Sequence, residues 1–135
     1  MTQVPSLPLG SALVFLGGGG GAWARYMTGR WCSAWLGPVA ASFPYATLTA
    51  NVLGALAMGL LSAWLTRHGT GGEAWRLLLG VGILGGYTTF SSFALEFASF
   101  VERGQIGLAA LYVGLTMLAS FAALFMGLYL MRSFG

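Results

Sequence analysis

Long uncharged, mostly apolar stretches alternate with short charged ones along the whole chain. No Asp, Glu, Lys or Arg occurs in 1–24, 31–66, 77–95 or 104–131. A helix that crosses the hydrocarbon of a bilayer needs about 20 largely apolar residues. The pattern therefore predicts four transmembrane helices, near 9–26, 45–65, 75–100 and 106–131. The expected fold class is an all-α membrane protein, with residues 1–135 forming a single integral membrane domain.

The composition strengthens this prediction and excludes other classes of protein. The chain is 57% hydrophobic and 7% charged, with a net charge of +3, which is far more apolar than an ordinary soluble domain. The six basic residues are all arginines spread over several helix ends, so no basic face is expected and nucleic acid is not a predicted partner. The single Cys32 excludes an internal disulfide and a multi-cysteine metal site. The first apolar segment lacks a positively charged start, so it does not resemble a cleavable signal.

The arginines do not decide how the helices are oriented. The odd-numbered connections are predicted to carry Arg25, Arg30 and Arg103. The opposite side carries an equal set, which is Arg67, Arg76 and Arg132. Orientation normally follows the Lys/Arg excess on the cytoplasmic side. Either other signals decide the orientation, or the chain inserts both ways, which would allow an antiparallel homodimer.

Glycines and aromatic residues shape the first helix and its connection. Five consecutive glycines, 17–21, predict a close helix–helix contact, because glycine lets backbones approach in a membrane. Trp31 and Trp35 are expected in the first connection, at the depth where aromatic side chains favour the membrane interface. Pro38 and Pro44 are expected to end helices there. His68 is expected to be solvated in a polar second connection.

Polar side chains recur at helical spacing in the second and fourth helices. Thr47 and Asn51 are four residues apart and share a face. An asparagine in hydrocarbon needs hydrogen-bond partners, so Asn51 either joins helices or lines a polar path. Tyr112, Thr116 and Ser120 are also spaced four apart and form a hydroxyl stripe on an otherwise apolar helix.

The third helix contains the least helix-like apolar stretch, GVGILGGYTTFSSFALEF. Gly85 and Gly86 weaken a helix, and Thr88 and Thr89 add to this. We therefore predict a break near 85–88. Non-helical backbone is tolerated at membrane depth only where protein or water solvates it. Its freed carbonyls could hold a cation, as in transporters with discontinuous helices.

Two aromatic residues and one acid follow this predicted break. Phe90 and Phe93 are three apart on one face, and the positive edge of a phenyl ring can meet an anion. Such contacts give the moderate binding that conduction requires. Hydroxyls and the Asn51 amide could replace the water lost by a small anion. Glu96 would repel an anion at the centre of a pore, so it must lie toward one end, be protonated or be paired.

These residues together resemble the Fluc (CrcB-type) fluoride channels. The resemblance rests on GGYTTFSSF, on LTAN in the second helix, on GAWARY after the first, and on the hydroxyl spacing in the fourth. It covers nearly the whole chain. The family motif often reads TTFSTF, whereas Ser92 stands here and retains a hydroxyl.

The resemblance implies a fold and a set of roles. The fold is a dual-topology, antiparallel homodimer of four-helix subunits, with the third helix broken mid-membrane and two fluoride pores. A central structural sodium ion would lie on the backbone carbonyls of Gly85 and Thr88 from both subunits. Arg25 matches an arginine near a vestibule, although it could equally be a membrane-edge anchor, and Glu96 matches an acidic position. The implied fluoride path comprises Thr47, Asn51, Thr89, Phe90, Phe93, Tyr112, Thr116 and Ser120.

The sequence is accordingly interpreted as a passive fluoride channel of a bacterial cell membrane, not an enzyme. One alternative is a small dual-topology multidrug exporter, but such exporters use an acidic residue in the first helix and 9–24 contain none. The other alternative is a non-transporting assembly subunit, in which the glycines and Asn51 serve packing alone.

Overall fold

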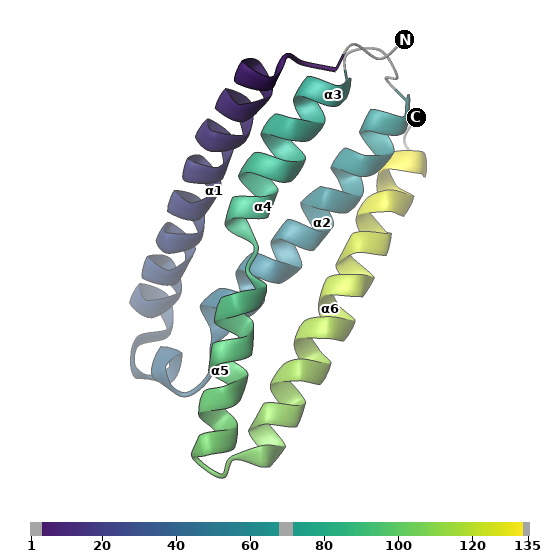
Figure 1. Cartoon of the computed structure of the whole chain (residues 1–135). Coiled ribbons are helices and arrows are strands. Elements are labelled where there is room, and N and C mark those ends of the chain that lie inside the picture. Colours follow the sequence, from purple (N-terminus) through teal and green to yellow (C-terminus); the bar gives the residue numbers. More distant parts are fainter. Residues whose placement is uncertain (1–3, 68–71, 134–135) are drawn as a thin grey trace.

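The computed structural model describes residues 4–67 and 72–133, and within these ranges the chain consists of helices and short connections (Figure 1). The elements are α1 (Leu7–Leu36), η1 (Gly37–Ala41), α2 (Tyr45–Arg67), α3 (Gly72–Trp75), η2 (Arg76–Leu84), α4 (Gly85–Tyr87), α5 (Phe90–Glu102) and α6 (Ile106–Ser133). Four stretches are long and apolar enough to cross a membrane, namely Leu7–Ala41, Tyr45–Arg67, Gly72–Glu102 and Ile106–Ser133. The prediction of an all-α chain with four membrane-length helical stretches is confirmed.

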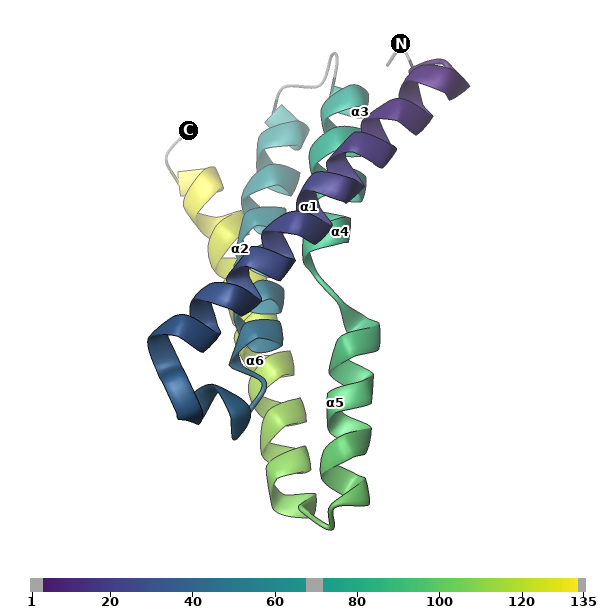
Figure 2. The ribbon, with the colours of Figure 1, turned by 90° about the vertical axis from the view of Figure 1, so that its left-hand side faces the viewer.

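The helices pack mainly as two pairs. α2 lies along α6, while α1 packs on η2 and α4. Figure 2 shows α1 crossing the other helices obliquely, with α5 continuing below α4 after a non-helical link. The start of α1 and the end of α6 lie at one end of the molecule, and the turn between α5 and α6 lies at the other (Figure 1).

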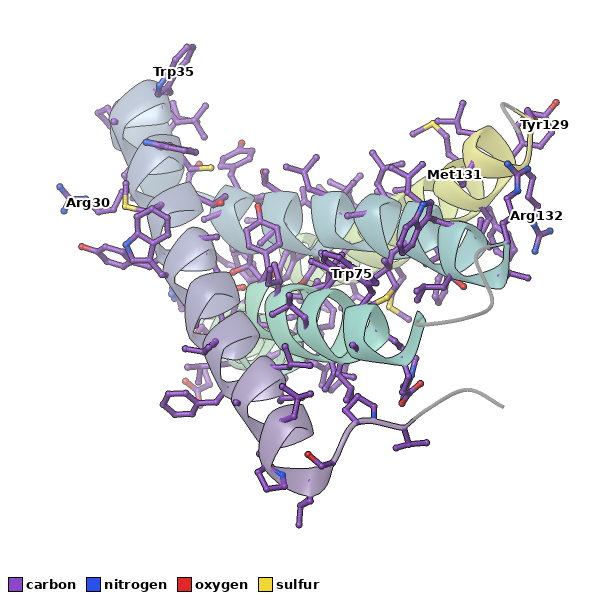
Figure 3. All side chains as sticks on the ribbon, turned by 90° about the horizontal axis from the view of Figure 1, so that it is seen from above. Arg30, Trp35, Trp75, Tyr129, Met131 and Arg132 are labelled. Carbon is purple, nitrogen blue, oxygen red and sulfur yellow. The ribbon has the colours of Figure 1, made fainter. Side chains whose placement is uncertain are left out.

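α1 is much longer than predicted. Trp31 and Trp35 were expected in the first connection, and this was wrong because both lie in the last turns of α1. After Pro8, in the first turn of α1, the next proline is Pro38, which lies in η1, and Pro44 directly precedes α2. Trp35 is exposed and points away from the other helices (Figure 3). His68 lies outside the described residues.

Close approach of α1 to the third stretch depends on two of the five glycines. Gly17 and Gly21 are buried. A methyl group on Gly17 would overlap the carbonyl oxygen of Leu78, and one on Gly21 would overlap that of Ile83. The predicted close helix–helix contact is therefore confirmed for these two positions.

The third stretch departs from a regular α-helix at two places. η2 is a π-helix, with one extra residue in each turn. Of the predicted break near 85–88, only Thr88 is non-helical, because Gly85 and Gly86 remain helical in α4. The two glycines are therefore not the residues at which the helix breaks. Instead, a methyl group on Gly86 would overlap the Gly18 carbonyl, which shows that this glycine serves packing against α1. The extended residues are Thr88 (φ −78°, ψ 159°) and Thr89 (φ −152°, ψ 123°).

Candidate functional site

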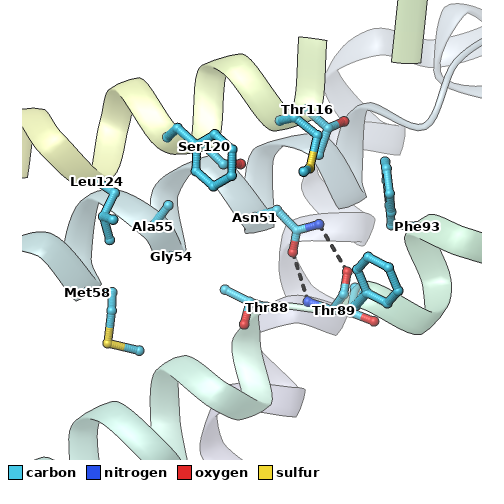
Figure 4. Close-up of a pocket in the computed structure, with 13 residues that line it drawn as sticks. Asn51, Gly54, Ala55, Met58, Thr88, Thr89, Phe93, Thr116, Ser120 and Leu124 are labelled. Atoms are coloured by element: carbon cyan, nitrogen blue, oxygen red, sulfur yellow. Dashed lines mark hydrogen bonds between the residues drawn. The ribbon is translucent and has the colours of Figure 1, made fainter. Parts of the chain in front are cut away.

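The extended residues between α4 and α5 are held by one side chain of α2. Asn51 Nδ2 donates to the Thr89 carbonyl at 3.0 Å, and the Thr89 amide donates to Asn51 Oδ1 at 2.8 Å (Figure 4). In a continuous α-helix this amide would donate to the carbonyl of Gly85, four residues earlier. Asn51 thus replaces a helical hydrogen bond and leaves the Gly85 carbonyl without its usual donor.

Thr89 also starts α5. Its Oγ1 accepts a hydrogen bond from the amide of Ser92 at 3.2 Å and donates to the Ser92 hydroxyl at 3.2 Å. A threonine at this position satisfies an amide that the helix itself leaves unpaired. The helix therefore resumes at Phe90 with a defined geometry.

α1 contacts the same extended link from its other side. Arg25 Nη1 lies 3.5 Å from the Thr88 carbonyl oxygen, to which it donates. The hydroxyls of Thr28 and Tyr87 lie 3.0 Å apart and share a hydrogen bond. The link between α4 and α5 is thus held by α1 and α2 together.

Six of the eight predicted path residues line one cavity of about 330 Å³ beside this link (Figure 4). They are Asn51, Thr89, Phe90, Phe93, Thr116 and Ser120. The hydroxyls of Thr116 and Ser120 are buried and have no hydrogen-bond partner among residues 4–67 and 72–133. Two unpaired hydroxyls beside a cavity are available to a polar occupant.

The two phenylalanines differ strongly in burial. Phe93 is 8% exposed and packs on Tyr112, with ring centroids 5.1 Å apart. Phe90 is 77% exposed in the single chain, and its ring centroid lies 5.8 Å from that of Phe93. Phe93 therefore belongs to the packed core, while Phe90 lines the cavity and is largely exposed.

The other two path residues meet Glu96 in a separate cluster. Thr47 Oγ1 donates to Glu96 Oε1 at 2.7 Å, and the Tyr112 hydroxyl donates to Glu96 Oε2. Tyr112 is fully buried among Phe43, Phe93 and Phe100. Each carboxyl oxygen of Glu96 thus accepts a hydrogen bond from a hydroxyl group.

Sequence reasoning named the members of this cluster but did not predict that they meet. Thr47, Glu96 and Tyr112 come from three different helices, and spacing within one helix carries no information about such a contact. The hydroxyl pair of Thr28 and Tyr87 was missed for the same reason. No group of three His, Cys, Asp or Glu side chains in the described part of the chain is placed to hold a metal ion.

Comparisons with known proteins match almost the whole chain to the same group of proteins. A family model described as CrcB-like protein, Camphor Resistance (CrcB), matches residues 12–128. A relative from Novosphingobium aromaticivorans, named fluoride-specific ion channel FluC, is 53% identical over 122 residues, which are 90% of this chain and 95% of the relative. A FluC of Erythrobacter litoralis is 52% identical, with 99% of each chain covered. A third, from Sphingopyxis alaskensis, is 49% identical over 88% of this chain and 92% of the relative.

Proposed function

The chain belongs to the CrcB-like protein family, and from that premise we propose that it is a fluoride-selective ion channel. It is a multi-pass membrane protein and not an enzyme. The relatives that carry the fluoride-channel name match it over at least 88% of its length at about half identity. The observation in this structure that supports the proposal best is the cavity beside Asn51, with its two unpartnered hydroxyls.

We propose that fluoride passes between this cavity and the Glu96 cluster. Thr116 and Ser120 would donate their free hydroxyl hydrogens to the ion, and Asn51 retains one amide hydrogen that Thr89 does not use. Phe93 lies between the cavity and Tyr112, so its ring edge can meet the ion with the moderate strength that conduction needs. Thr47 and Tyr112 continue the path as hydroxyl donors.

We also propose that two copies form the channel as an antiparallel homodimer with two pores and dual topology. The cavity is open on one side of the single chain, and the extended residues Thr88 and Thr89 are part of its lining. Polar groups and non-helical backbone are costly against hydrocarbon unless protein covers them. A second copy that covers Phe90 and the extended link would remove this cost. The extended link would then lie in the middle of the membrane.

A structural sodium ion at the dimer centre is part of the proposal. The donor set fits, because the Gly85 carbonyl has lost its helical donor and main-chain oxygens suit a hard cation. The Thr88 carbonyl accepts one long hydrogen bond from Arg25 and has a second lone pair free. The sodium would join the two extended links and supply a fixed positive charge. Replacing sodium by a large organic cation during purification should abolish fluoride flux. Full retention of flux would show that the channel needs no sodium ion.

Flux from the purified protein decides between a channel and a non-transporting subunit. Reconstituted liposomes loaded with fluoride or chloride should release fluoride and retain chloride. An assembly subunit would release neither ion. An exporter would instead move an organic cation at the expense of a proton gradient.

A further inference from the structure

A second cavity of about 180 Å³ opens at the end of the molecule that carries η1 and the turn between α5 and α6. Glu96, Ser99 and Arg103 line it from α5 and its C-cap, spaced three and four residues apart, so they lie along one face of the helix. Ser42 and Phe43 line it from the connection before α2. The cavity therefore lies on the far side of Glu96 from the Asn51 cavity.

The free polar groups of this second cavity are hydrogen-bond donors. The guanidinium of Arg103 makes no hydrogen bond or ion pair within 4–67 and 72–133, and the Ser99 hydroxyl likewise has none there. Ser42 already donates its hydroxyl hydrogen to the Val39 carbonyl at 2.7 Å. Both oxygens of Glu96 are engaged by Thr47 and Tyr112. Arg103 and Ser99 thus remain to bind an anion.

Arg103 also offsets a negative electrostatic potential at this end of the protein. The acidic side chain of Glu96 lines the cavity, and the C-terminus of α5 contributes a partial negative charge, because helix carbonyls point that way. Without a cation, this mouth would repel fluoride. Among the described residues, Arg103 is the only cationic side chain that lines the cavity.

We propose that Arg103 and Ser99 form an anion-binding mouth that delivers fluoride to the Glu96 cluster at this end of the protein. The inference rests on the proposed channel function and assigns a role to two residues outside the path described above. The mouth binds the ion weakly and precedes the narrow, selective part of the path. Its removal should therefore lower the entry rate of the ion and leave the discrimination between fluoride and chloride unchanged.

The test compares initial fluoride efflux from liposomes that contain wild-type protein, Arg103→Gln or Arg30→Gln. Arg30 is the matched control, because it is exposed like Arg103 and carries the same charge toward the same end, but it does not line the cavity and points away from the other helices (Figure 3). At low ionic strength and sub-saturating fluoride, Arg103→Gln should slow efflux about three- to tenfold, since clefts lined by one sign of charge raise ion entry by such factors or more. The difference should shrink above about 0.5 M salt, where screening acts within a few ångströms.

Two further variants keep the test independent of folding. Arg103→Lys retains the charge and should retain most of the rate, and Ser99→Ala should lower it by a smaller factor. All variants should elute at the wild-type position on size exclusion, because both side chains are at or near the surface. Three results would each refute the proposed anion-binding mouth while leaving the channel function intact. They are a wild-type efflux rate for Arg103→Gln, an equal loss of rate in Arg30→Gln, and release of chloride through Arg103→Gln. Failure of the wild-type protein to conduct fluoride would instead overturn the channel itself.

Discussion

Asn51 and Thr116 line the same cavity, yet substitution should destabilise the protein only at Asn51. Asn51→Ala removes the two hydrogen bonds of 3.0 and 2.8 Å that hold Thr89. The Thr89 amide is then left unpaired, which costs about 1–3 kcal/mol, and the lost bond to its carbonyl adds about 1 kcal/mol. We therefore expect a loss of about 2–4 kcal/mol in folding free energy, together with a large loss of fluoride flux.

Thr116→Val provides the matched comparison. The Thr116 hydroxyl is buried without a partner in the described part of the chain, and valine has nearly the same shape. Replacing an unpaired buried hydroxyl by a methyl group is neutral or stabilising. Thr116→Val should therefore lower fluoride flux while the midpoint of thermal unfolding in detergent stays at or above the wild-type value.

The assay pairs thermal unfolding with liposome efflux on the same preparations. The reasoning predicts that both variants lose flux and only Asn51→Ala loses stability. Equal destabilisation by the two substitutions would refute the view that Asn51 holds the extended link in place while Thr116 only lines the path. Wild-type flux in Thr116→Val would remove its hydroxyl from the path.

Three further tests use substitutions at the phenylalanines, at two glycines and at Tyr112. Phe90→Ala and Phe93→Ala should both cut fluoride flux without loss of the dimer, and Phe93→Ala, which removes a ring buried within the chain itself, should also cost about 3–5 kcal/mol; an unfolding midpoint at the wild-type value for Phe93→Ala would contradict this burial. Gly59→Ala should cost about 1–3 kcal/mol because its methyl group overlaps a carbonyl of α6, whereas Gly114→Ala meets open space and should be neutral by the same thermal assay. Tyr112→Phe leaves one carboxylate oxygen without its donor and should destabilise the protein by about 1.5–3 kcal/mol and slow efflux; an unchanged midpoint would show that the bond contributes nothing.

The sequence predicted those features that depend on one helix at a time. Charge-free stretches predicted four membrane-length helices, and the glycine run predicted a close helix–helix contact, which the structure places at Gly17 and Gly21 against the third stretch. The predicted end of α1 was wrong. Tryptophans favour the membrane interface both in helices and in loops, so composition alone could not show that Trp31 and Trp35 lie in the helix.

Features that depend on contacts between helices could not be predicted from spacing. Gly85 and Gly86 favoured a break by local propensity, but packing of Gly86 against α1 keeps them helical. The backbone becomes extended at Thr88 and Thr89, where Asn51, 38 residues earlier in the chain, captures the Thr89 amide. The family resemblance supplied the candidate path residues, and the structure supplied the Glu96 cluster and the second cavity.

Ion release from reconstituted liposomes is the measurement that tests the central claim most directly. Vesicles loaded with equal concentrations of potassium fluoride and potassium chloride are followed with ion-selective electrodes after a potassium ionophore is added, with protein-free vesicles as the baseline. The account predicts rapid release of fluoride and baseline release of chloride. Equal release of the two anions, or no release of fluoride, would contradict it.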